Sequence, residues 1–245
     1  MISIFLMLVW TAVSVIASQL LVGKLMLWLL GAEQFVQPVW MAIYSALSYV
    51  VALGLVVLLP NTLAKKRRCQ IDLSADRTEL GLREWPTWTD IGLAPVGFIA
   101  YLLLAAGLTA LFSNFPWFDP NEAQDLGFSF YVAGFDRMVA FITLVVVAPI
   151  AEEVIFRGWL YGKIREKFSA TVPEAWSVVF SMLLVSVLFG AVHLQWNVGV
   201  DVFVLSLVLC GLREITGTIY SGIILHMLKN GIAFFLLYVL GMGLG

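Results

Sequence analysis

The stretch ITLVVVAPIAEEVIFRGWLYG, from Ile142 to Gly162, decides the fold, because it is almost entirely apolar and yet contains two glutamates and an arginine. A helix that crosses a membrane needs about 20 mostly apolar residues. Ionisable side chains at membrane depth are costly, so they usually face other helices or a water-filled cavity. The stretch therefore predicts a spanning helix whose charged residues Glu152, Glu153 and Arg157 face the interior of the protein.

The rest of the chain has the same apolar character. Of its 245 residues, 61% are hydrophobic and 12% are charged, and the mean hydropathy is +0.97. Soluble domains carry about 25% charged residues. The composition excludes a soluble enzyme, a disordered chain and a nucleic-acid-binding protein, which would need a basic face. It predicts an all-α fold, a polytopic transmembrane helical bundle with a buried polar cavity, formed as one membrane domain over 1–245.

Seven apolar runs predict about seven spans. They cover 3–30, 38–60, 91–113, 138–160, 174–193, 198–212 and 217–241. Backbone groups in lipid must bond within their own segment, so each span is expected to be a helix. The sixth run has 15 residues, or about 22 Å of helix against a hydrocarbon thickness of about 30 Å. We expect the turn before it to lie below the membrane surface, beside a cavity.

The basic residues predict the orientation, because cytoplasmic loops carry an excess of lysine and arginine. The opposite connections, 31–37, 114–137 and 194–197, hold Arg137 as their one basic residue. We therefore expect a cytoplasmic N-terminus, a cytoplasmic connecting loop at 61–90, and a position in the cell membrane of a prokaryote. The basic residues that this orientation places on one side are Lys65, Lys66, Arg67, Arg68, Arg77, Arg83, Arg157, Lys163, Arg165, Lys167 and Arg213.

Polar side chains recur at helical spacing in three of the predicted spans. Glu153 and Arg157 are four residues apart, so they share a helix face and can pair. His226 and Asn230 have the same spacing, and His193 ends another apolar run. The chain has two histidines in all, and both lie in apolar segments. We expect these three polar stripes to converge in one pocket.

Such a pocket suits the hydrolysis of an amide bond. Glu152 can take a proton from a water molecule and so create the nucleophile. His193 can hold or orient that water, while His226 and the amide of Asn230 can donate hydrogen bonds to an oxyanion. No serine or cysteine stands next to a histidine, so a covalent mechanism is disfavoured.

The sequence resembles a known family at these residues. EEVIFR (Glu152–Arg157), FGAVH (Phe189–His193) and HMLKN (His226–Asn230) match the motifs EExxxR, FxxxH and HxxxN. In this order, on apolar helices, they resemble the CAAX protease and bacteriocin-processing (CPBP, or Abi) family of intramembrane endopeptidases. The resemblance covers a catalytic core at 148–232, and the first three predicted spans have no matching motif.

The resemblance implies an endopeptidase that cleaves a membrane-associated or prenylated, CAAX-type protein or peptide at the lipid bilayer. Glu152 would be the catalytic base, His193 would help to activate water, and His226 with Asn230 would form the oxyanion site. We expect no cofactor. The alternative is zinc held by Glu152, His193 and His226, since zinc accepts such ligands, although the zinc motif HExxH is absent.

Two other functions stay open at this point. Ionisable residues inside membranes also serve proton relays in transporters, but the chain shows no inverted repeat or pair of broken helices. A bacteriocin immunity or scaffold protein on the same fold is the other possibility, since a fold does not fix a function. The sequence does not give the substrate, the cleavage position or the oligomeric state.

Overall fold

The computed structural model describes residues 4–65, 73–82, 85–120, 122 and 134–241. Within these ranges the chain forms seven helical rods and no strand, and the first rod is kinked at Gly31, whose backbone is not helical (φ 73°, ψ 166°). Five of the rods contain one α-helix or an α-helix with a π-helical end. The first three rods are α1 (Ile4–Phe35), then α2 (Pro38–Leu53), η1 (Gly54–Leu58) and α3 (Leu59–Lys65), then α4 (Trp88–Phe112).

The fourth rod is the longest and changes helix type along its length. It consists of α5 (Gly134–Phe141), the π-helical segment η2 (Ile142–Val147), α6 (Ala148–Glu152), the π-helical segment η3 (Glu153–Leu160) and α7 (Tyr161–Ser169). The last three rods are α8 (Glu174–Ala191), α9 (Trp196–Thr216), and α10 (Tyr220–Phe234) with η4 (Phe235–Val239). The prediction of an all-α protein is confirmed.

Six of the rods in the described part of the chain are long and apolar enough to cross a membrane, which makes this a multi-pass integral membrane protein. They are Ile4–Phe35, Pro38–Lys65, Trp88–Phe112, Gly134–Ser169, Glu174–Ala191 and Tyr220–Val239. The seventh rod, α9, is not in this set and buries side chains along most of its length. Four of the basic residues used for the orientation, Lys66, Arg67, Arg68 and Arg83, lie outside the described residues.

The helix ends differ from the predicted ones where charged residues continue a helix. The fourth rod runs to Ser169 instead of 160, and α9 covers 21 residues, or about 32 Å. The expectation of a short sixth span is therefore wrong, and with it the argument for a submerged turn. The apolar run ended at 212, but the helix continues to Gly217, whose left-handed backbone (φ 69°) ends it.

The chain divides into two compact units. The first consists of Met1–Ala75, Asp125–Ile155 and Met227–Gly245, and the second of Asp76–Gln124 and Phe156–His226. The division falls inside the fourth rod and inside α10.

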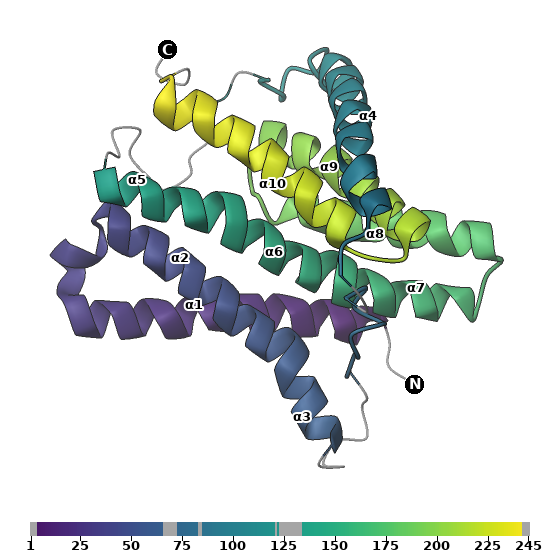
Figure 1. Cartoon of the computed structure of the whole chain (residues 1–245), viewed down its shortest axis with the longest axis horizontal. Coiled ribbons are helices and arrows are strands. Elements are labelled where there is room, and N and C mark those ends of the chain that lie inside the picture. The colour runs from purple at the N-terminus through teal and green to yellow at the C-terminus, as the bar shows by residue number, and fades with distance from the viewer. Residues whose placement is uncertain (1–3, 66–72, 83–84, 121, 123–133, 242–245) are drawn as a thin grey trace. The chain divides into compact units, whose positions relative to one another are not determined.

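In the first unit, α2 packs along α5, η2 and α6, as Figure 1 shows. The core between these helices and the end of α10 consists of Ala42, Ala140, Val145, Phe234 and Tyr238. The hydroxyl of Thr143 donates a hydrogen bond to the backbone oxygen of Ala42 at 3.2 Å, with both residues buried. This contact fixes α2 against η2.

In the second unit, α9 packs against α4 and α8. Gly190 of α8 lies so close to α9 that an added Cβ atom would stand 2.7 Å from the backbone oxygen of Gly199. Small residues allow helix backbones to approach closely in membranes, so this glycine pair explains the tight contact. The apolar core of the unit contains Ala94, Tyr101, Val204, Leu205, Leu209, Leu212 and Leu225.

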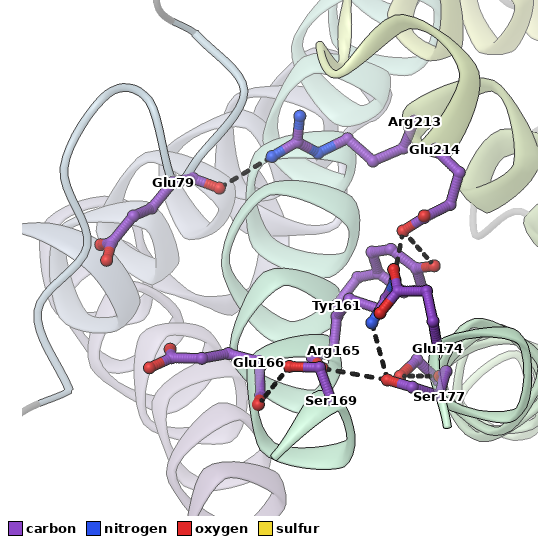
Figure 2. Close-up of polar contacts among 10 residues, drawn as sticks. Glu79, Tyr161, Arg165, Glu166, Ser169, Glu174, Ser177, Arg213 and Glu214 are labelled. Carbon is purple, nitrogen blue, oxygen red and sulfur yellow. Dashed lines mark hydrogen bonds and ion pairs between the residues drawn. The ribbon is translucent and has the colours of Figure 1, made fainter. Parts of the chain in front are cut away.

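Charged side chains fasten the helices of the second unit to one another. The hydroxyl of Tyr161 donates to Glu214 at 2.8 Å, and Arg165 donates to Glu214 at 3.2 Å and to Ser177 at 2.7 Å. Arg165 also pairs with Glu174. Figure 2 shows this network joining α7, α8 and α9, so the charged residues that lengthen the predicted helices have tertiary partners.

A second set of polar contacts in this unit, around Asp90, holds the N-terminus of α4. The carboxylate of Asp90 is 1% exposed. Its Oδ2 accepts hydrogen bonds from the backbone N–H (2.9 Å) and hydroxyl (2.7 Å) of Thr87, in a capping box. Its Oδ1 accepts from the hydroxyls of Thr218 at 2.5 Å and Ser221 at 3.1 Å. Asp90 thus ties α4 to the turn between α9 and α10.

Candidate active site

Glu152 lies in the first unit, where it is the last residue of α6 and is half-buried. The hydroxyl of Tyr49, from α2, donates a hydrogen bond to its Oε1 at 2.5 Å. The two residues are 103 positions apart in the sequence. Sequence reasoning missed Tyr49, because nothing in the apolar pattern of α2 distinguishes it from the other tyrosines of the chain.

The helix around Glu152 is not a regular α-helix. The five residues of α6 stand between the π-helical segments η2 and η3, and π-helical bulges occur frequently at functional sites. Pro149 gives one local cause, since it has no N–H to donate to the carbonyl of Val145 as an α-helix requires. Glu153, the first residue of η3, is fully buried.

Asn230 also belongs to the first unit. Its Nδ2 donates a hydrogen bond to the backbone oxygen of Leu144, in η2, at 2.9 Å. An asparagine amide has two N–H donors, so this bond uses one of them and fixes the orientation of the side chain. Asn230 thereby links α10 to the π-helical segment that precedes α6.

The second unit gathers three of the predicted site residues around the ring of Phe189. The guanidinium carbon of Arg157 lies 4.2 Å from the centre of this ring. The ring centres of His193 and His226 lie 5.2 Å and 6.1 Å from it, both edge to face. Arg157, Phe189 and His226 are buried. Phe189 was expected only as a motif letter, and the structure gives it a role as the surface on which these side chains pack.

The hydrogen bond of His193 determines which of its ring nitrogens carries the proton. Its Nδ1 lies 2.7 Å from the backbone oxygen of Phe189. A carbonyl oxygen only accepts hydrogen bonds, so Nδ1 is the donor, and Nε2 of the neutral ring is an acceptor. His193 follows the end of α8 at Ala191, two residues before the predicted end of that span, and precedes Leu194, which has the left-handed φ of 58°.

The six predicted site residues are therefore divided between the units. Glu152, Glu153 and Asn230 lie in the first, and Arg157, His193 and His226 in the second. Within the described ranges, no three or more histidine, cysteine, aspartate or glutamate side chains form a group that would hold a metal ion. The three residues of the alternative zinc set are split in the same way, with Glu152 in one unit and both histidines in the other.

The fold and these residues define a polytopic membrane protein with ionisable groups buried in its helices. Residues 134–232 match the family described as "Type II CAAX prenyl endopeptidase Rce1-like". This part of the chain is therefore a domain of the CAAX protease (CPBP, or Abi) family, and it contains all three sequence motifs. The match begins at 134, whereas the motifs suggested 148, and both end at 232. The chain has no significant match among curated proteins or solved structures.

Proposed function

We propose that this protein is an intramembrane endopeptidase that hydrolyses a peptide bond of a membrane-associated protein or peptide, including a prenylated, CAAX-type one, through a water molecule activated by Glu152. The observation that carries the proposal is the family domain at 134–232, which contains every residue of the proposed site. The N-terminus lies in the cytoplasm in this proposal, because that orientation places the basic residues on the cytoplasmic side.

The reaction needs a base, a positioned water and donors for an oxyanion. Glu152 takes a proton from the water, and the oxygen of the water attacks the carbonyl carbon of the peptide. His193 accepts a hydrogen bond from that water through Nε2, which the bond from Nδ1 to the backbone oxygen of Phe189 leaves as the acceptor. His226 and the second N–H of Asn230 donate to the oxyanion. The proton then passes from Glu152 to the amine that leaves as the C–N bond breaks.

Glu153 and Arg157 hold the helix that carries the base. Both are fully buried, and the guanidinium of Arg157 lies over the ring of Phe189. Buried charges require compensating partners, and a cation over an aromatic ring contributes up to about 2 kcal/mol when desolvated. We assign these two residues to positioning and give them no direct contact with the substrate.

Cleavage by the reconstituted protein tests the proposal. Purified protein in liposomes is mixed with an internally quenched, farnesylated peptide that ends in a CAAX sequence. We expect Glu152→Gln to lower kcat by about 10²- to 10⁴-fold, since that is the contribution of a general base. Glu166→Gln is the control, because Glu166 lies on the same rod and its side chain is 74% exposed. Equal rates in these two variants would contradict the proposal.

Removal of metal distinguishes the glutamate mechanism from the zinc alternative. We expect the rate to be unchanged after dialysis against excess chelator, because the proposed reaction uses only side chains. Elemental analysis of the purified protein accompanies the assay. Stoichiometric zinc, together with a loss of cleavage that zinc restores, would replace the glutamate mechanism by the alternative.

A further inference from the structure

We propose that Tyr49 is a positioning residue for the reaction, and that it holds the carboxylate of Glu152 in the orientation that accepts the proton of water. The inference rests on the proposed function. It starts from the bond between the Tyr49 hydroxyl and Oε1 of Glu152, which at 2.5 Å is at the short end of the range for an O–H group bound to a carboxylate. Tyr49 lies in α2, outside the family domain at 134–232.

A donor fixed on one oxygen fixes the whole carboxylate. Glu152 has three rotatable side-chain bonds, and an unheld carboxylate would sample several orientations. The bond to Oε1 restrains the plane of the group and therefore the direction of Oε2, the atom to which we assign the proton of the water. A misplacement of about 1 Å can cost about 10²-fold in rate, so such a restraint has a large effect on kcat.

A hydrogen bond two helical turns from Tyr49 holds α2 against the rod that carries Glu152. Ala42 lies seven residues before Tyr49, which is two helical turns, so the two residues share one face of α2. The backbone oxygen of Ala42 accepts the hydroxyl of Thr143 at 3.2 Å, and neither residue is exposed to solvent. This bond fixes α2 to the rod that carries Glu152. The backbone of α2 is therefore held on the face from which the side chain of Tyr49 extends to Glu152.

The second unit contains a matched pair without a proposed catalytic role. The hydroxyl of Tyr101 in α4 donates to Oδ1 of Asp201 in α9 at 2.6 Å. Both pairs join a tyrosine of one helix to a carboxylate of another, and both tyrosines lie in candidate spans. A structural role predicts the same outcome for the loss of either hydroxyl, whereas a positioning role predicts different outcomes.

The test compares Tyr49→Phe with Tyr101→Phe in the same liposome assay with the farnesylated, quenched peptide. We expect Tyr49→Phe to lower kcat by about 10- to 100-fold, the rate equivalent of one hydrogen bond to a charged group, with KM changed less than about 3-fold. A loss confined to kcat separates a positioning role from a change in substrate binding, which would raise KM. Tyr101→Phe should leave both kcat and KM unchanged.

Equal kcat values in the two variants would overturn the inference. Where Tyr49→Phe does not fold, 4-fluorophenylalanine at position 49 fills the place of the hydroxyl but cannot donate a hydrogen bond, so kcat should again fall; an unchanged kcat would overturn the inference. The proposed function fails separately. If Glu152→Gln cleaves normally, the function is wrong, and if only Glu152→Gln is inactive, the function stands and the role of Tyr49 does not.

Discussion

Two carboxylates, one in each unit, differ in the way that the proposed function requires of a structural acid and a catalytic base. Asp90 of the second unit is 1% exposed and accepts four hydrogen bonds, from Thr87, Thr218 and Ser221. Glu152 of the first unit is half-buried and accepts the hydroxyl of Tyr49. A carboxylate sealed among donors cannot meet a water molecule, whereas a partly exposed one can. The exposed fraction therefore distinguishes the two acids, although both lie in candidate spans.

The two histidines of the second unit give the largest expected effect among the changes to that unit. We expect His193→Ala and His226→Ala each to lower kcat by about 10²- to 10⁴-fold, with little change in Tm. In the proposed mechanism, the first variant loses the acceptor for the water and the second loses the donor to the oxyanion. Peptide cleavage and a thermal shift assay measure the two quantities. Full activity in either variant would remove that histidine from the mechanism.

Asp90 should affect stability and leave kcat unchanged, whereas Glu152 should affect kcat. We expect Asp90→Ala to lower the free energy of unfolding by about 3 kcal/mol, because the donors of Thr87, Thr218 and Ser221 would be left buried without an acceptor. The fraction that remains folded should keep its kcat. A thermal shift in detergent, with kcat corrected for the folded fraction, measures both. A folded but inactive Asp90→Ala would break the distinction between the two carboxylates.

The glycine contact between α8 and α9 gives a smaller effect. We expect Gly190→Ala to cost about 1–3 kcal/mol, because its Cβ would stand 2.7 Å from the backbone oxygen of Gly199. The matched control is Gly107→Ala in α4, where nothing lies within 4 Å of the added Cβ. Alanine is the better helix former by about 1 kcal/mol, so the control should raise Tm. A higher Tm for Gly190→Ala would refute the close approach.

The sequence predicts the helices well, because an apolar run long enough to cross a membrane has few alternatives to a helix. It predicts their ends poorly, since Lys163, Arg165 and Glu214 look like loop residues until their partners are known. Two of these pairs, Lys163 with Glu79 and Arg165 with Glu214, join distant parts of the chain. An apolar run shows where a helix enters lipid, whereas tertiary contacts determine where it ends.

The candidate site divides in the same way. The spacing of the motifs predicts Glu152, His193 and His226 as site residues, because ionisable side chains are costly in apolar helices and are usually functional or paired there. The π-helical segments around α6 and the bond from Tyr49 were not predictable, since both depend on which helix packs beside Glu152. Pro149 was the one local sign of an irregular helix.

The central claim of the proposed mechanism is that Glu152 and His226 act on the same reacting group, and a double-mutant cycle tests this proposal most directly. The rates of Glu152→Gln, His226→Ala and the double variant are compared in the peptide assay. Residues that act together show strongly non-additive losses, so we predict that the double variant is no slower than the slower single variant. Losses that multiply would show that the two residues act independently and would contradict the account.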